Sequence, residues 1–266
     1  MMTTVRRITG FLVPSLLAAS ACVVEITGIG DHEWDHEATE LVTRTEQVQG
    51  QTTLRVSGIN GTIRVTEWGD APWVSVRATK QVRSNSDEDA EAHLDDLEIR
   101  VWSTSAEIRV ETVQPLHTHG REYTVDYEIL VPEGLSLVGT NGNGDITVED
   151  LQSNVDLKVG NGNVRAIGFV GTGRVESGNG NVDVAMDLPE GGEIVLVVGN
   201  GTAFLTVQPD VSAELNAQVG NGSIAVTGLD MVTHVSEPHL LRSTLGSGDG
   251  MIDVLVGNGV IQIGVG

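Results

Sequence analysis

The densest group of potential metal ligands lies near the N-terminus, in Asp31-His32-Glu33-Trp34-Asp35-His36-Glu37. His32 and His36 are four residues apart, so in a helix they would share one face, with carboxylates between them. No third histidine lies nearby, and short acidic linkers are common in exported proteins. We therefore interpret this segment as a solvated acidic linker, with a His32–His36 metal site as the alternative, and predict no metal ion and no cofactor.

Aspartates that follow glycine-rich turns could bind calcium. Gly142-Asn143-Gly144-Asp145 and Gly246-Ser247-Gly248-Asp249-Gly250 are similar to calcium-binding nonapeptide repeats. Calcium needs several clustered oxygen ligands. The corresponding position of the other turns carries Asn163, Asn181, Thr202, Ser223 and Val260. A calcium-binding β-roll is therefore a weaker alternative.

Paired carboxylates would indicate a glycan-active enzyme, because glycosidases use two acids across one bond. Here the acids are spread over outward positions of predicted strands, as in Asp145, Glu149, Asp156, Glu176 and Asp183. The glycine-rich turns also lack the Lys-Ser/Thr of a phosphate-binding loop. The sequence thus predicts a protein without catalytic residues, and a glycan-active β-helix enzyme is the less favoured alternative.

Cys22 is the only cysteine of the chain and follows a segment typical of export signals. Arg6 and Arg7 are followed by an apolar run and by the small residues Ala19-Ser20-Ala21, so residues 1–21 are predicted to be a signal peptide. Leu16 to Cys22 resembles a bacterial lipobox, although Ala19 stands where leucine is usual. We predict lipidation of Cys22, a membrane anchor through that lipid and, from Val23, the outer membrane of a Gram-negative bacterium. Simple secretion is the alternative.

The composition excludes one class of partner. The 266-residue chain has a formal net charge of −22, only 3% aromatic residues and 33 glycines. Such an acidic protein repels the phosphate backbone, so nucleic acid is not an expected partner. The lone cysteine permits no internal disulfide, and the fold must rest on packing and hydrogen bonds.

A Gly-Asn-Gly motif recurs through the second half of the chain. Its central asparagines are separated by 18, 18, 21, 21 and 37 residues, and Asn60 repeats the Asn-Gly turn earlier; the turn residues are Asn60, Asn143, Asn161, Asn179, Asn200, Asn221 and Asn258. Apolar residues alternate with polar ones on both sides, as in Leu157, Val159, Val164 and Ala166 around Asn161. This period of two predicts short strands with one buried face, joined by sharp Asn-Gly turns.

Two architectures fit such units. Each could be a hairpin, because Asn-Gly between alternating segments favours one. A fixed period near twenty residues instead favours stacked coils, in which equivalent strands pair in parallel. We predict an all-β protein with a parallel β-solenoid of about 18–21 residues per coil over residues 135–266. A β-rich region at 46–134 with one short helix near 87–97 precedes it, after a lipidated acidic tether at 22–45.

The ends of such a stack need protection, because a last coil leaves unpaired backbone groups. Residues 260–266 are apolar and uncharged. We predict that this segment forms the open end, covered either by residues 229–245 or by another copy. Residues 229–245 interrupt the period and are the predicted recognition loop.

The order of motifs resembles a known family. A Leu-Arg-Val and Gly-Ile-Asn-Gly-Thr-Ile-Arg-Val opening, an acidic helical insert, Tyr-Glu-Ile-Leu-Val-Pro-Glu-Gly and recurring Asn-Gly turns are similar to the bacterial "putative adhesin" β-repeat family, domain of unknown function 4097. The resemblance covers residues 46–266 and implies a β-solenoid at the cell envelope, without catalytic residues. The expected function is a structural or adhesin-like interaction module with an envelope or extracellular protein or glycan partner. An envelope-stress sensor or regulatory partner is the alternative.

Overall fold

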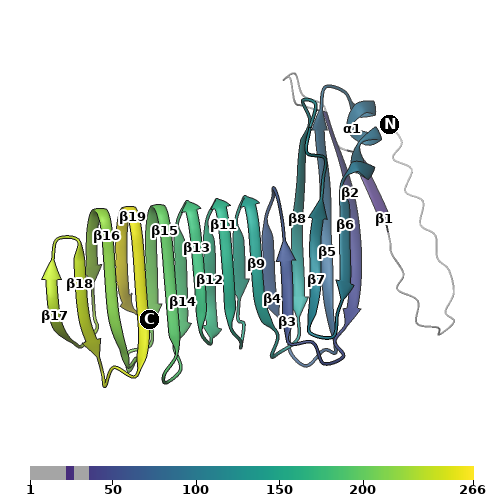
Figure 1. Cartoon of the computed structure of the whole chain (residues 1–266). Coiled ribbons are helices and arrows are strands. Elements are labelled where there is room, and N and C mark those ends of the chain that lie inside the picture. Colours follow the sequence, from purple (N-terminus) through teal and green to yellow (C-terminus); the bar gives the residue numbers. More distant parts are fainter. Residues whose placement is uncertain (1–21, 27–35) are drawn as a thin grey trace, which may run out of the picture.

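The computed structural model describes residues 22–26 and 36–266. In this part the chain is mostly β-strand, and the strands belong to one mixed sheet with parallel and antiparallel pairs (Figure 1). The predicted all-β class with one short helix is confirmed. The predicted signal peptide at 1–21 and His32 of the histidine pair lie outside the described residues.

The N-terminal part combines antiparallel and parallel pairing. Its elements are β1 (Cys22–Ile26), β2 (His36–Gln47), β3 (Thr53–Ser57), β4 (Ile63–Glu67), β5 (Trp73–Ser84), α1 (Asp87–Ala92), η1 (Leu94–Asp96), β6 (Glu98–Ser103), β7 (Glu107–Val113) and β8 (Glu122–Val131). Strands β1, β2, β5 and β8 pair antiparallel in that order, and β6 pairs antiparallel with β7. Parallel pairing begins where β7 meets β3 and β8 meets β4.

The short helix α1 begins where the sequence places it. Ser86 is its N-cap and accepts a hydrogen bond from the backbone N–H of Asp89 at 3.1 Å. Three acidic residues in the first turn favour the positive end of the helix dipole. Ala90, Leu94 and Leu97 are buried and fix α1 and η1 against the sheet. Neither helical segment of the described part has the length and apolar character needed to cross a bilayer.

The expected tether at 22–45 differs from the structure. β1 and β2 occupy much of it, and β2 pairs along its whole length with β5. The inward face of β2 carries Ala38, Glu40 and Val42, so a charged residue interrupts its apolar alternation. Glu40 forms a buried ion pair with Lys80 of β5. The charge of Glu40 is thus balanced by a residue of another strand, forty positions further along the chain. The sequence of this segment alone looks like a polar linker, although the segment forms a strand.

The repeat part consists mainly of strands that pair in parallel with equivalent strands 18, 21, 37 or 58 residues away. They are β9 (Ser136–Asn143), β10 (Ile146–Glu149), β11 (Val155–Asn161), β12 (Val164–Val170), β13 (Gly173–Asn179), β14 (Val182–Asp187), β15 (Glu193–Val207), β16 (Ala213–Val226), β17 (Met231–Glu237), β18 (Leu240–Leu245) and β19 (Gly250–Val265). We call two strand segments joined by an Asn-Gly bend a coil. In successive coils, β9 pairs in parallel with β11 and β11 with β13, while β10 pairs with β12 and β12 with β14.

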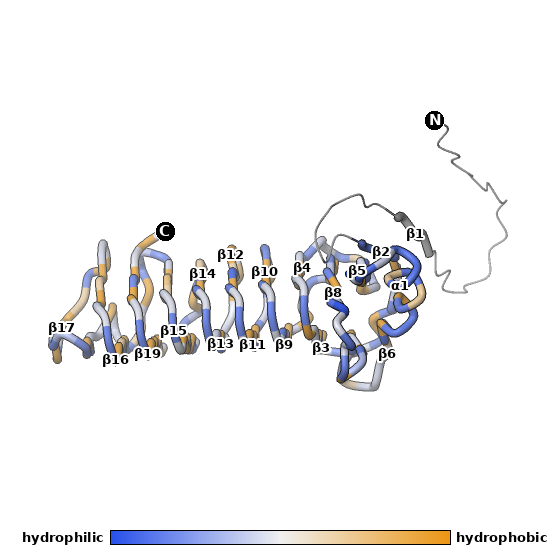
Figure 2. Tube along the Cα trace, turned by 90° about the horizontal axis from the view of Figure 1, so that it is seen from above, coloured by the Kyte–Doolittle hydropathy of each residue, from blue (hydrophilic) through white to orange (hydrophobic). Residues whose placement is uncertain are grey.

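The first and second strand segments of the coils therefore form two rows that face each other (Figure 2). Their inward side chains fill a common core. Leu157, Val175 and Leu196 are fully buried in the first row, and Val164, Val182 and Ala203 are fully buried in the second. Burial of each Val or Leu side chain contributes about 1.5–3 kcal/mol relative to exposure. Most of the side chains in this core are aliphatic, and Phe169 of β12 is the fully buried aromatic residue among residues 136–265, which agrees with the low aromatic content.

The order of coils in space differs from their order in the chain. β19 lies between β15 and β16 and pairs in parallel with both, so the C-terminus does not mark the end of the molecule (Figure 1). The prediction that residues 260–266 form an open end is therefore wrong. The 229–245 excursion is not a loop but mostly the hairpin β17–β18, and β18 pairs antiparallel with the first half of β16. Similarly, β3 lies between β7 and β9.

The helix region supplies a pH-dependent contribution to stability. Arg121 donates to both carboxylate oxygens of Asp89 at 2.7 Å, and Ser84 donates to one of them. Arg121 first, and then Ser84, hold the pKa of the Asp89 carboxyl well below its usual range. A carboxyl whose pKa is lowered by folding stabilises the protein above its unfolded pKa of about 3.9, and this stabilisation is lost as the pH falls further.

We therefore expect Asp89→Asn to lower the unfolding free energy by about 1–2 kcal/mol at pH 7, a value reduced for partial exposure. The difference from the wild type should shrink between pH 4 and pH 2. Thermal denaturation at pH 7, 4 and 2.5 measures it, with the exposed Asp95→Asn as the control. An Asp89→Asn penalty that is unchanged at pH 2.5 would contradict the assignment.

Candidate functional site

The side chains of the turn asparagines form one continuous row. We call this row, formed by Asn60, Asn143, Asn161, Asn179, Asn200, Asn258 and Asn221 in spatial order, the amide ridge. From Asn143 on, each Nδ2 donates to the Oδ1 of the preceding asparagine at 2.8–2.9 Å. Neighbouring strands are about 4.8 Å apart. The ridge is thus an exposed array of amides that are already hydrogen-bonded to one another.

The ridge requires glycine on its flanks. A Cβ on Gly180 would lie 2.0 Å from the carbonyl oxygen of Gly162, and φ of Gly180 is +143°. Gly201 has the same relation to Gly180, at 2.0 Å and φ +146°. Both the close approach of adjacent coils and the positive φ exclude a side chain. The Gly-Asn-Gly motif is therefore explained by packing between coils, without a ligand.

A second row of polar side chains lies two residues after the asparagines. Asp145 Oδ1 accepts from the backbone N–H of Asn163 at 2.7 Å, and Asn163 Oδ1 accepts from Asn181 N–H at 2.9 Å. Asn181 Oδ1 accepts in turn from the N–H of Thr202 at 2.9 Å. Each of these side chains thus accepts a hydrogen bond from the backbone of the next coil. Asp145, one of the two aspartates that suggested calcium, is therefore engaged in this row.

The second candidate aspartate also has a local partner. Asp249 accepts from Ser212 Oγ at 2.8 Å and from Ser247, and these bonds, with Ser247 first, lower the pKa of its carboxyl. No group of three or more His, Cys, Asp or Glu side chains in the described part is arranged to hold a metal ion. The two Gly-rich aspartate turns thus lie at different places in the fold and do not combine into one site.

The other acidic candidates pair with basic side chains. Glu149 accepts from Arg64 at 3.2 Å, Glu176 from Lys158 at 3.0 Å, and Asp183 from Arg165. Asp156 lies on the exposed face of β11. Hydrogen bonds from Lys158 and Arg174 lower the pKa of the Glu176 carboxyl. Glu149, Glu176 and Asp183 therefore face cations rather than a second carboxylate.

His36 and the pair His117 and His119 lie at two places in the N-terminal part. His36 begins β2, and its Nδ1 lies 2.9 Å from Asp87 Oδ1 at the start of α1. His117 and His119 belong to the loop between β7 and β8, with ring centroids 6.3 Å apart and φ of His119 at +51°. Leu116 beside them is 97% exposed. The structure thus gives His36 a role as a contact between β2 and α1.

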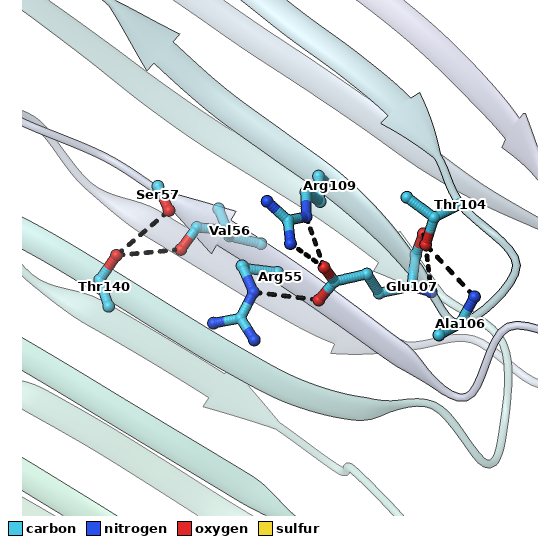
Figure 3. A network of polar contacts seen from close by, with 8 residues as sticks. All are labelled: Arg55, Val56, Ser57, Thr104, Ala106, Glu107, Arg109 and Thr140. Atoms are coloured by element: carbon cyan, nitrogen blue, oxygen red, sulfur yellow. Dashed lines mark hydrogen bonds and ion pairs between the residues drawn. The ribbon is translucent and has the colours of Figure 1, made fainter.

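A polar network that the sequence reading missed lies on the outer face of β3, β7 and β9. Figure 3 shows Glu107 between Arg55, whose Nε donates at 3.0 Å, and Arg109. Bonds from Arg109 and then Arg55 lower the pKa of the Glu107 carboxyl. The Arg109 guanidinium also lies 5.9 Å from the Trp102 ring centroid. Because Arg55 and Glu107 are separated by 52 residues, only the pairing of β3 with β7 brings them together.

The exposed apolar side chains include one aromatic pair and one pair on a single strand. Trp68 and Trp73 are 43% and 38% exposed, and their rings pack edge to face with centroids 5.9 Å apart. On the outer face of β19, Met251 and Leu255 are 41% and 44% exposed. Surfaces of this kind contact proteins, sugars or membranes more often than ordinary surface does. Trp68 follows β4 and Trp73 begins β5, so the turn between these strands brings the two rings together.

A hollow of about 470 Å³ lies where the coils return from the second row to the first. Phe169, Met186 and Val207 contribute apolar side chains to it, and Asp187 is the only acidic side chain in its lining. The hollow contains no second titratable side chain that could act with Asp187. Its lining therefore offers no pair of titratable side chains.

Several solved structures are similar to this chain. A structure described as a putative cell adhesion protein from Clostridium sporogenes has 14% identity and a TM-score of 0.43, covering 84% of this chain and 99% of its own. A putative adhesin from Bacteroides fragilis has 13% identity, a TM-score of 0.29 and coverage of 85% and 96%. A putative adhesin from Parabacteroides merdae has 10% identity, a TM-score of 0.23 and coverage of 84% and 95%. No protein-family model and no curated protein matches the chain.

Proposed function

We propose that the chain is a lipid-anchored, non-enzymatic protein of the bacterial cell envelope, which presents a parallel β-solenoid to an envelope or extracellular partner. The outer membrane is the proposed location. The observation that carries this proposal is the repetitive architecture itself. Its outward side chains form ion pairs or exposed polar rows along the stack. Its turn asparagines hydrogen-bond to the asparagines of neighbouring coils. Such a surface suits adhesion or support better than chemistry.

The proposed anchor is consistent with the position of β1. The backbone of Cys22 pairs with Val42 at the start of this strand, so the mature N-terminus would begin on the N-terminal sheet. The repeat part extends away from that sheet in Figure 1. A lipid on Cys22 would therefore hold one end of an elongated molecule at the membrane, and the outer strand faces would be available to a partner.

Lipidation is tested by comparing the wild type with Cys22→Ser in a Gram-negative host. We expect the wild type to be labelled by palmitate and to sediment with membranes, because two or more acyl chains give a stable anchor. Cys22→Ser should lose the label and should leave the membrane fraction. Equal membrane association of both proteins would overturn the anchor.

The interaction role is tested by site-specific photo-crosslinking in intact cells. Crosslinking residues are placed at Asp156 and Arg165, which are exposed on the outer faces of the two rows, and at Leu116 in the β7–β8 loop as the control. We expect a discrete adduct with an envelope component from the strand positions and not from the loop. Absence of any adduct, together with turnover of a glycan by the purified protein, would contradict the proposal.

A further inference from the structure

The two ends of the stack are finished differently. At the N-terminal end, Asn60 donates to the carbonyl oxygen of Tyr123 at 3.1 Å, and β4 is covered by β8. At the other end, β18 covers residues 213–218 of β16. The second half of β16, Asn221–Val226, pairs with β19 on one side, and no other strand of the described part pairs with its opposite side. We call this half-strand the open edge.

The open edge also leaves the core incompletely covered. Ile261 and Ile263 of β19 are buried to 0% and 2% exposure. Their register partners on β16, Ile224 and Val226, are only half-buried although they pack against the same core. The apolar column of the second row therefore ends in two aliphatic side chains that another strand would cover.

The hydrogen-bonding groups of the open edge have a defined direction. In earlier coils, the N–H of Ile146 donates to Asn163 O at 3.0 Å, and the N–H of Val164 donates to Asn181 O at 2.9 Å, always toward the next coil. Ile224 occupies the equivalent position in the last coil, so its N–H faces the open side. Asn221 donates to Asn258, so its own Oδ1 is the acceptor that a further asparagine of the amide ridge would use.

The composition of this edge distinguishes it from a protected one. Natural edge strands commonly carry lysine, proline, an inward charge or a bulge, which prevent pairing with other chains. β17, the other edge at this end, has an irregularity between Thr233 and Val235. The open edge, Asn-Gly-Ser-Ile-Ala-Val, contains no charge and no proline.

A second copy of this chain does not fit the open edge. Two copies related by a two-fold axis normal to the sheet would pair β16 with β16 antiparallel, which cannot continue a parallel row of asparagines. The first row also extends beyond β16 by β18 and β17, so two copies meeting there would overlap (Figure 1). A two-fold dimer through β16 is thus excluded, and a formal net charge of −22 opposes other contacts between copies, so we take the occupant to be a strand from a different protein.

We propose that the open edge binds an extended segment of another protein as an added parallel strand. The segment would be about six residues, or roughly 20 Å, long. It would carry an amide or other donor opposite Asn221 and aliphatic residues at alternate positions to cover Ile224 and Val226. Basic residues would flank it, because the chain has a formal net charge of −22. This surface is separate from the outer strand faces and does not depend on the lipid.

The probe is a peptide with the sequence of residues 255–265, Leu-Val-Gly-Asn-Gly-Val-Ile-Gln-Ile-Gly-Val, with two lysines added at each end. This sequence is the parallel neighbour of β16 within the protein itself. We expect saturable one-to-one binding to the full mature chain by fluorescence anisotropy. Hydrogen exchange at the Gly222, Ile224 and Val226 amides should slow on binding, and a scrambled peptide should have neither effect.

The decisive variant is Ile224→Pro, which removes a donor on the open side but none that pairs with β19. It should weaken peptide binding at least about tenfold, whereas Ile224→Val keeps the N–H and should change binding less than about threefold. If Ile224→Pro does not fold, the proposal is tested by hydrogen exchange at the Gly222, Ile224 and Val226 amides of the wild type, with and without peptide. The proposal is overturned if the peptide does not bind, if protection appears at β15 and β19 through strand exchange, or if the same amides are protected by self-association without peptide.

Discussion

Replacing Gly180 with alanine is expected to lower the free energy of unfolding by about 3–5 kcal/mol, the sum of a backbone clash and a positive-φ penalty. The added Cβ would lie 2.0 Å from Gly162 O, a backbone atom held by the neighbouring coil. Relief would require the two coils to separate, which would break the hydrogen bonds of the amide ridge on both sides of Asn179. Urea denaturation followed by circular dichroism measures the loss.

Gly134→Ala is the matched control for this prediction. Gly134 has φ +85°, but a Cβ there would have no atom within 4 Å. Its substitution should cost only the conformational penalty, about 1–2 kcal/mol. If both substitutions lowered the free energy of unfolding equally, the close approach of adjacent coils would not be the reason for glycine at position 180. The explanation of the Gly-Asn-Gly motif by packing between coils would then be wrong.

Truncation of Ile261 is expected to be much more costly than the same truncation of Ile224. Ile261→Ala should lower the unfolding free energy by about 3–4 kcal/mol, because the site is fully buried between two neighbouring strands. Ile224→Ala removes a half-buried side chain at the open edge and should cost about 1 kcal/mol. The two residues are register partners with identical side chains, so each is the control for the other.

Chemical denaturation of both variants measures the pair. The opposite ranking would arise if the C-terminal strand were the last of the stack, as the sequence alone suggested. The comparison therefore tests the position of β19 between β15 and β16 directly, independently of any partner.

Local patterns predicted much of the fold. The period-two alternation around each Asn-Gly bend indicated strands with one buried face, and Ser86 followed by acidic residues indicated the helix. These features depend on neighbours in sequence. The shared position of the asparagines also followed from spacing, and their side chains do form one row.

Features that depend on contacts between distant segments could not be predicted in the same way. Part of β2 was predicted to be a tether because acidic residues precede and enter it, and its pairing with β5, which includes the Lys80–Glu40 ion pair, joins residues that are far apart in sequence. The network of Arg55, Glu107 and Arg109 depends on the pairing of β3 with β7. The order of the last coils was missed because similar repeats carry no signal that specifies their neighbours.

The placement of β19 constrains how such a molecule can lengthen during evolution. A unit appended after Val265 would emerge from an interior slot already bordered by β15 and β16, and would have no adjacent edge on which to stack. Duplication of an 18-residue stretch between β11 and β14 would instead insert a coil whose neighbours keep their register. Length differences among homologues should therefore arise by duplication of coils in the middle of the chain. The N-terminal sheet and the arrangement of β15, β19 and β16 should stay the same.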